Sequence, residues 1–140
     1  MRPISKKGDY AIRGMVYLAG QQPDRVVLAG EIARAMDVPP QFLAKIFQQF
    51  GKLGLVRSFR GSGGGFQLAR PPGEITLLEI VEAVEGPVMP NRCVLSGGAC
   101  SREKGCTVHP VWKKVQKSVV EILGGVTLEE LSGRKRAARR

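Results

Sequence analysis

The amino-acid sequence predicts a mainly α-helical fold that contains one small β-hairpin. Apolar residues recur at helical spacing in several segments, and a run of glycines separates two short apolar segments of the kind that form strands. The 140 residues are enough for about one domain. The predicted helices cover residues 8–20, 27–36, 40–52, 75–84 and 110–123, and the predicted strands cover residues 55–59 and 66–68.

The second and third predicted helices are separated by a short break. Pro39 disfavours helical geometry at Val38, and Pro40 suits the first position of a new helix. Asp37, at the turn, tolerates left-handed geometry better than most residues. Such a short connection is typical of a helix-turn-helix, and the small residue Ala33 stands where the two helices would cross.

The third predicted helix has two chemically different faces. Its apolar face is made by Phe42, Leu43, Ile46, Phe47, Phe50 and Leu53. Its polar stripe is made by Gln41, Lys45, Gln48 and Lys52. The stripe carries amides and ammonium groups but no carboxylate, whereas an ordinary solvated face mixes both signs of charge. Amides and ammonium groups are the groups that hydrogen-bond base edges and phosphates.

The predicted hairpin follows this helix directly, which is the layout of a winged helix. Its turn is the glycine-rich run 61–65, where Ser62 and Gly63 would bring the backbone close to phosphates. Arg57 and Arg60 supply positive charge, and Arg60 is placed to enter a minor groove. A nucleotide-binding enzyme loop is not indicated, because the chain has no G-x-x-x-x-G-K-[ST] motif.

The last long helix is amphipathic and has no evident partner within so small a domain. Its apolar stripe is made by Val111, Trp112, Val115, Val119 and Ile122, with lysines at 113, 114 and 117 opposite. The stripe could pack onto its own domain or onto a second copy of the chain. We favour a homodimer. The preceding helix, 75–84, begins at a capping box formed by Thr76 and Glu79.

Positive charge is concentrated in two parts of the chain. The formal net charge is +10, with +7 in residues 1–70, −2 in residues 71–133 and +5 in residues 134–140. A polyanion is the natural partner, either a nucleic acid or an anionic membrane face. No apolar run approaches the ~20 residues of a membrane helix and no signal peptide is apparent, so we expect a cytoplasmic protein with no membrane partner.

All three cysteines, Cys93, Cys100 and Cys106, fall within 14 residues, and the only histidine, His109, follows three positions later. Thiolate and imidazole ligands suit zinc, copper or iron–sulfur centres. The spacing is compatible with a Cys3His zinc site or with an iron–sulfur cluster that accepts one non-cysteine ligand. A catalytic Cys–His pair is disfavoured because no orienting group is evident.

With the winged helix, the three-cysteine loop and the terminal helix in this order, the chain resembles the IscR/NsrR/CymR family of bacterial winged-helix regulators. The resemblance covers about residues 1–131, and GLVRSFRGSGGGF is its most specific segment. It implies a homodimer that binds palindromic operators in double-stranded DNA, with repression the expected mode of action. Cluster-bearing members of the family sense iron, cluster supply, oxygen or nitric oxide.

The resemblance also implies roles for individual residues. Cys93, Cys100 and Cys106 match the cluster cysteines, and His109 matches the fourth ligand of a 2Fe–2S cluster in the IscR-like pattern. Asp9 matches the position from which the partner subunit supplies an aspartate to a 4Fe–4S cluster in the NsrR-like pattern, so both cluster types stay open and 2Fe–2S is preferred. The contact positions on DNA are matched by Gln41, Lys45 and Arg60, and Ala44 replaces a glutamate of the IscR-like pattern.

We therefore expect a winged helix-turn-helix domain followed by a long C-terminal dimerisation helix, in a transcription regulator and not an enzyme. The expected organisation is a DNA-binding domain (1–86), a cluster-binding loop (87–109), a dimerisation helix with a short terminal helix (110–131) and a basic tail (132–140). The alternative is a structural-zinc Cys3His module that interacts with nucleic acid or protein without sensing. Gln41, Lys45, Gln48, Arg57, Arg60, Ser62 and Gly63 are the expected DNA contacts.

Overall fold

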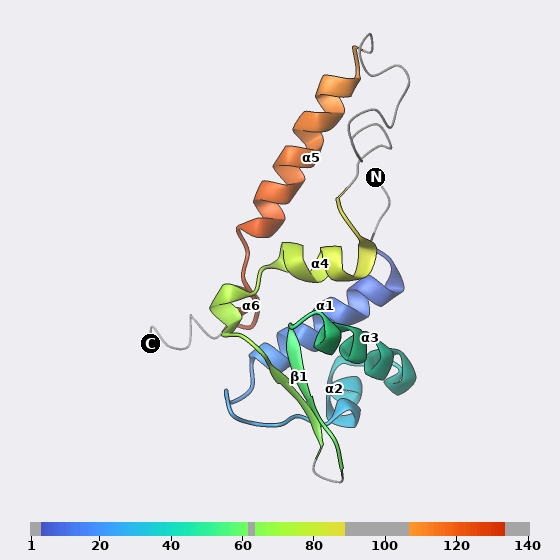
Figure 1. Ribbon diagram of the computed structural model, residues 1–140, viewed down its shortest axis with the longest axis vertical. Helices are drawn as coiled ribbons and strands as arrows, with labels where there is room; N and C mark the ends of the chain where they lie inside the picture. Colours follow the sequence, from blue (N-terminus) through green and yellow to red (C-terminus); the bar gives the residue numbers. More distant parts are fainter. Residues whose placement is uncertain (1–3, 62–63, 89–106, 134–140) are drawn as a thin grey trace.

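The computed structural model describes residues 4–61, 64–88 and 107–133. Its elements form one winged domain from which a long helix rises (Figure 1). In chain order they are α1 (Lys6–Ala19), α2 (Ala29–Met36), α3 (Pro40–Lys52), β1 (Val56–Phe59), β2 (Gly65–Leu68), the 3-10 helix η1 (Pro72–Glu74), α4 (Leu77–Glu85), α5 (His109–Gly124) and α6 (Leu128–Leu131). The expected fold class, mainly α with a small β-hairpin wing, is confirmed.

Helix α1 lies at the centre of the domain and packs against α2, α3, α4 and α6. It begins at Ser5, whose hydroxyl accepts a hydrogen bond from the backbone N–H of Gly8 at 3.1 Å. Its inward face is buried at Gly8, Ala11, Gly14, Met15, Leu18 and Ala19. The helix therefore starts two residues before the predicted boundary, because the cap at Ser5 satisfies the first turn.

The predicted helix-turn-helix is present in α2 and α3. Helix α2 ends at Asp37, which adopts the left-handed conformation with φ 55° and ψ 52°. Helix α3 runs over the predicted residues, with Pro40 in its first turn. Ala33 is buried as expected, at 3 % exposure.

Helix α2 starts two residues later than predicted. Val27, which was assigned to this helix, instead pairs in antiparallel fashion with Phe66 of β2. Val27 lies in the extended backbone before α2, and a β-branched residue suits such pairing with a strand. The wing therefore has three adjacent backbone segments, and the register of its two named strands places Arg57 opposite Gln67.

Aromatic rings join the helices to the wing inside the core. Phe47 lies 5.9 Å from Phe50 and 5.1 Å from Phe66 between ring centroids, and the Phe47–Phe66 contact is edge-to-face. All three side chains are buried. The buried face of α3 is narrower than predicted, because Phe42 is 54 % exposed. The Phe42 ring contacts Tyr10 of α1, with ring centroids 6.1 Å apart.

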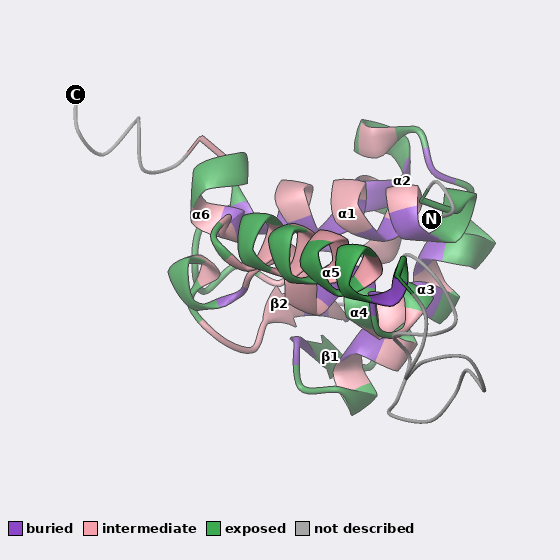
Figure 2. Cartoon of the chain, turned by 90° about the horizontal axis from the view of Figure 1, so that it is seen from above, coloured by how far each residue is buried: buried purple, intermediate pink, exposed green. Residues whose placement is uncertain are grey.

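The C-terminal elements return to the domain around α4. The capping box predicted at Thr76 and Glu79 is present in both directions. An antiparallel bridge joins Thr76 to Thr127, and Leu128 of α6 is fully buried. Helix α5 contacts α4 at its lower end and then extends away from the domain, so much of its surface is exposed (Figures 1 and 2).

Two glycines in helices test how closely α1 approaches α3. A Cβ on Gly14 would lie 2.9 Å from the Phe47 ring, whereas a Cβ on Gly30 would meet nothing within 4 Å. We expect Gly14→Ala to lower the free energy of unfolding by about 1–3 kcal/mol, because overpacking outweighs the gain in helix propensity. Gly30→Ala, the matched control, should raise it by up to about 1 kcal/mol. Denaturant unfolding measures both; a stabilising Gly14→Ala would contradict the close approach.

Candidate nucleic-acid interface and cysteine segment

The polar stripe of α3 faces solvent, as the sequence predicts. Gln41, Lys45 and Gln48 are exposed, while Leu43 and Phe47 on the opposite face are fully buried. Burial of the apolar face therefore fixes which side chains the helix presents. Because no carboxylate stands on this helix, the presented surface attracts anions and offers amide groups for hydrogen bonding.

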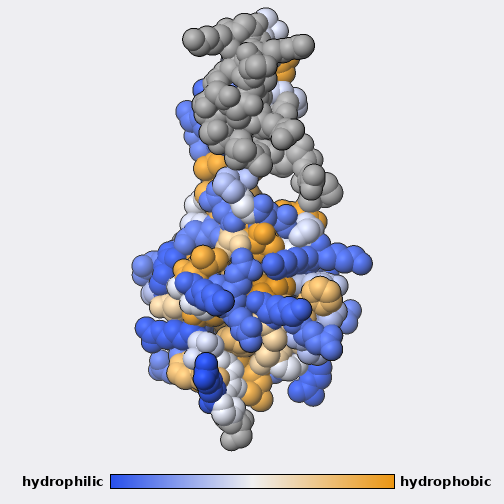
Figure 3. All heavy atoms as spheres, turned by 45° about the vertical axis from the view of Figure 1, so that its right-hand side comes forward, coloured by the Kyte–Doolittle hydropathy of each residue, from blue (hydrophilic) through white to orange (hydrophobic). Residues whose placement is uncertain are grey.

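The wing presents two of its predicted cations next to this helix. Arg57 and Arg60 are exposed, and neither forms an ion pair with another residue of the described ranges. Ser62 and Gly63 lie outside the described residues. Figure 3 shows hydrophilic side chains over much of the lower part of one face of the molecule, with apolar patches between them.

Glycine is required where the wing turns back along the chain. A Cβ on Gly64 would lie 2.3 Å from the carbonyl oxygen of Phe59, and a Cβ on Gly65 would lie 2.3 Å from that of Val27. Neither distance is compatible with a side chain. Gly64 therefore allows the turn to close against β1, and Gly65 allows the backbone at Val27 to approach β2. The sequence predicted a close backbone approach at this glycine run, but not these partners.

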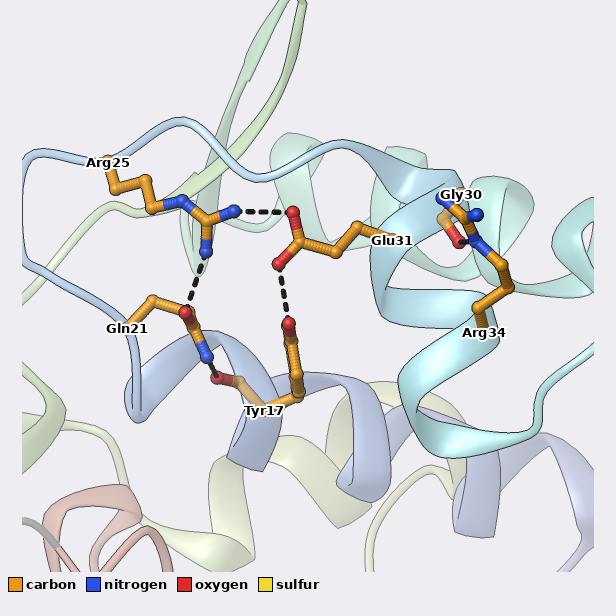
Figure 4. Close-up of polar contacts among 6 residues, drawn as sticks. All are labelled: Tyr17, Gln21, Arg25, Gly30, Glu31 and Arg34. Carbon is orange, nitrogen blue, oxygen red and sulfur yellow. Dashed lines mark hydrogen bonds and ion pairs between the residues drawn. The ribbon is translucent and has the colours of Figure 1, made fainter.

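A polar network that the sequence analysis did not find joins α1, α2 and the loop between them. Glu31 of α2 accepts a hydrogen bond from the Tyr17 hydroxyl of α1 at 2.5 Å, and it forms an ion pair with Arg25 at 2.5 Å (Figure 4). Arg25 also donates to the Gln21 side chain at 2.7 Å. No periodic pattern could have revealed it, because the partners come from two helices and the loop between them.

The network fixes the ionisation of its central carboxyl group. Hydrogen bonds from Tyr17 and then Arg25 hold the pKa of Glu31 below its usual value, and the same Tyr17–Glu31 bond raises the pKa of Tyr17. Glu31 is therefore an ionised acceptor at neutral pH, and Tyr17 keeps its proton and remains a donor.

A second ion pair holds the segment that follows the wing. Arg70 donates to Glu79 of α4 at 2.7 Å and 3.1 Å, and it also donates to the backbone carbonyl of Glu74. The Arg70 interaction lowers the pKa of Glu79 and raises that of Arg70. Arg70 is thus occupied within the fold, whereas Arg57 and Arg60 form no ion pair with any residue that the structure describes.

Of the predicted metal ligands, the structure describes the two that are not cysteines. His109 is the first residue of α5 and is 6 % exposed. Asp9 is about half exposed on α1 and forms an ion pair with Arg13 at 2.7 Å. Cys93, Cys100 and Cys106 lie outside the described residues. Within the described ranges, no three histidine, cysteine or acidic side chains gather as a metal site would require.

The cysteine segment comprises residues 89–106. The described residues on either side of it contact the rest of the domain. Before it, Glu85 accepts hydrogen bonds from the backbone N–H and the hydroxyl of Ser5, and the Val88 carbonyl accepts one from the Gln116 side chain of α5 at 2.9 Å. After it, a buried imidazole opens α5. Thiolates in such a segment, with an imidazole at its end, have the donor chemistry of an iron–sulfur or zinc centre.

The fold and the exposed surface define a winged helix-turn-helix protein of the class that regulates transcription by binding DNA. Residues 4–134 match the sequence family Rrf2, described as an iron-dependent transcriptional regulator, and the chain belongs to this family. The described part of the chain contains no helix that is long and apolar enough to cross a membrane.

Relatives of this chain agree with the assignment. A putative HTH-type transcriptional regulator of Mycobacterium tuberculosis is 34 % identical over 130 residues, which cover 93 % of this chain and 81 % of the relative. The transcriptional regulator IscR of Xenorhabdus nematophila is 32 % identical over 128 residues, covering 91 % and 77 % of the two chains. Family and relatives are transcription regulators and not enzymes, as the sequence analysis expected.

Two solved structures are similar over nearly the whole chain. CymR, described as the global cysteine regulator of B. subtilis, superposes with a TM-score of 0.76 at 29 % identity and covers 96 % of this chain and 98 % of its own. T. potens IscR superposes with a TM-score of 0.75 at 29 % identity, covering 97 % and 88 %. The resemblance to IscR-like and CymR-like regulators is confirmed.

Proposed function

We propose that this regulator is a homodimer that reads a palindromic DNA operator and responds to an iron–sulfur cluster held by Cys93, Cys100 and Cys106. The observation that carries the DNA-binding role is the carboxylate-free stripe of α3, exposed beside two wing arginines without ion-pair partners in the described ranges. Lys45 and Gln41 would contact base edges and phosphates, and Arg60 would enter the adjacent minor groove. Gln48, Arg57, Ser62 and Gly63 complete the proposed contact set.

The open face of α5 supports the homodimer. Val111, Val115, Val119 and Ile122 recur every three or four residues, so they share one face of the helix. Val111 is 54 % exposed and Ile122 is 67 % exposed, whereas the Gln116 side chain is turned toward Val88 of its own domain. A second α5 would cover the exposed apolar stripe and bring two reading heads together on a two-fold axis, which matches a palindrome.

The donor set supports the cluster. Three thiolates with His109 as the fourth ligand would suit a 2Fe–2S cluster; Asp9 of the partner subunit is the alternative and would suit a 4Fe–4S cluster. His109 is preferred because it follows Cys106 by only three positions, whereas Asp9 lies on α1 and is ion-paired with Arg13. The cluster would supply a redox-sensitive and labile group. This chain's own residues would transmit its presence, because Val88 and His109 connect the cysteine segment to α4 and α5.

Mutating the proposed DNA contacts should weaken binding in a salt-dependent way. Lys45→Ala and Arg60→Ala should each lower the affinity for an operator by about 1–3 kcal/mol and reduce the salt slope by about 1 for each phosphate that the variant no longer neutralises. Affinity is measured by fluorescence anisotropy at salt concentrations from about 50 to 300 mM, the range in which counterion release dominates. Lys117→Ala, an exposed lysine on α5, is the control and should behave as the wild type. Equal losses of affinity in all three variants would mean that charge alone, and not this docking, governs binding.

A charge placed on the apolar stripe of α5 should dissociate the dimer. Ile122→Glu would bury an unpaired carboxylate in the proposed seam, which costs about 3 kcal/mol or more. Sedimentation equilibrium should give a dimer for the wild type and a monomer for this variant. Lys113→Glu, an exposed position on the opposite face of α5, is the control and should remain a dimer. A wild type that sediments as a monomer at every concentration would overturn the homodimer.

The cluster is tested by protein prepared without oxygen and reconstituted with iron and sulfide. We expect a coloured protein, loss of bound iron and sulfide in Cys100→Ala, and retention in Ser101→Ala, the neighbouring control. His109→Ala should shift the absorption and resonance-Raman bands if the imidazole is the fourth ligand, and Asp9→Ala should shift them if the aspartate is. A colourless protein with stoichiometric zinc that unfolds on chelation would favour the structural-zinc alternative.

A further inference from the structure

We propose that Glu31 is a positioning residue for DNA reading: through Arg25 and Tyr17, it fixes the wing relative to the helix-turn-helix. The inference rests on the proposed DNA-binding role. Among the described residues, Glu31 forms no hydrogen bond or ion pair with a proposed DNA contact. It would act through the backbone segment 24–27, which lies between the network and the wing.

One side of segment 24–27 is attached to the wing. The backbone N–H of Val27 donates to the carbonyl of Phe66 at 2.9 Å, and the N–H of Phe66 donates to the carbonyl of Val27 at 2.8 Å. The side-chain amide of Gln67 donates to the carbonyl of Asp24 at 2.6 Å. These three hydrogen bonds make the segment a second, strand-like partner of β2, on the side away from β1. Its backbone runs so close to β2 that Gly65 has no room for a Cβ.

The other side of the segment is attached to the helices by Glu31. One carboxylate oxygen receives Arg25 of the segment, and the other receives the Tyr17 hydroxyl of α1 (Figure 4). Gln21 completes the ring, because it accepts from Arg25 and donates to the carbonyl of Tyr17 at 3.3 Å. Glu31 itself stands on α2, the first helix of the helix-turn-helix. The Glu31 carboxylate thus joins α1 and α2 to the segment that pairs with β2 of the wing.

The Glu31 network contributes little to the free energy of unfolding of the domain. The Arg25 side chain is 41 % exposed and that of Glu31 is 28 % exposed, and ion pairs at such sites typically contribute about 0–1 kcal/mol. The wing hairpin has four residues in each strand, so it depends on neighbours for its orientation. The Glu31 network can therefore contribute little to the free energy of unfolding and still determine how the wing, and with it Arg60, is oriented.

Electrostatics and positioning predict opposite signs for the same substitution. Removing a negative charge from a DNA-binding protein strengthens its attraction for phosphates, so Glu31→Gln would bind DNA more tightly if charge were all that mattered. If Glu31 positions the wing, the same variant binds more weakly. Tyr17→Phe changes no charge and removes one donor to the carboxylate, so it isolates the geometric effect.

The experiment uses the full chain and a DNA duplex that the wild type has selected from a randomised library. We expect Glu31→Gln to lower the affinity about 5- to 20-fold and Tyr17→Phe about 3- to 10-fold, in the range that loss of one or two hydrogen bonds gives. Glu82→Gln, an exposed carboxylate on α4, is the control and should bind as well as the wild type or better. Tighter binding by Glu31→Gln would overturn the proposal.

A double-mutant cycle identifies the route by which Glu31 acts. The penalty of Glu31→Gln should largely disappear in an Arg60→Ala background, since the wing then has nothing to position. It should persist in a Lys45→Ala background, since Lys45 stands on α3. Equal penalties in the two backgrounds would mean that Glu31 has no specific link to the wing.

A measurement without DNA separates this proposal from the proposed function. In Glu31→Gln, hydrogen exchange should accelerate about tenfold at the amides of Val27 and Phe66 and stay unchanged in the core of α3, as expected for local opening. Unchanged protection at both amides would refute the positioning role. If the wild type selects no duplex, the DNA-binding proposal fails, and the exchange data still decide whether Glu31 holds the wing.

Discussion

The packing of the Phe47 ring determines much of what the domain can present to a partner. The ring occupies the space that Gly14 leaves on α1, and it contacts Phe50 on its own helix and Phe66 on the wing. Because the residues flanking it at helical spacing are buried as well, α3 has only one rotational setting in which its apolar face is covered. That setting turns the polar stripe outward. The orientation of the reading helix is therefore a consequence of core packing.

The wing is held by a different kind of interaction. Phe66 enters the core, but the outer side of the hairpin is fixed by backbone pairing with Val27 and by the partly exposed network around Glu31. Core packing responds little to solution conditions, whereas hydrogen bonds and ion pairs near the surface are weaker and screened by salt. The helix-turn-helix and the wing thus differ in how rigidly they are held. In the proposed DNA complex, such a wing would adapt more readily to the width of a minor groove.

The sequence was sufficient to predict the elements whose signals are local. Helix α3 was predicted with its observed boundaries, because Pro40 marks its start and the buried residues repeat at helical spacing. The capping box at Thr76 was predicted from two residues three apart. Val27 was misassigned, because its partner Phe66 is 39 positions away and only the folded wing makes it a strand residue. The Glu31 network was missed for the same reason, since it depends on how α1, α2 and their loop meet. The roles of the cysteines stay a prediction.

The connections of the cysteine segment to α4 and α5 limit how a proposed cluster could reach the DNA-binding surface. Both of its ends join helices, and Gln116 connects α5 to Val88, directly before the undescribed residues. On the other side, Gln49 of α3 donates to the carbonyl of Ala83 in α4 at 3.1 Å and accepts from Lys7 of α1 at 3.2 Å. A change at the segment can therefore act on the seam through α5, or on the reading helix through α4. The first route would change the distance between the two DNA-binding domains of the proposed dimer, and the second would change the position of α3 within one domain. Since α5 has only α4 as its extensive contact within the described chain, a shift of α5 costs little internal packing, which favours the route through the seam.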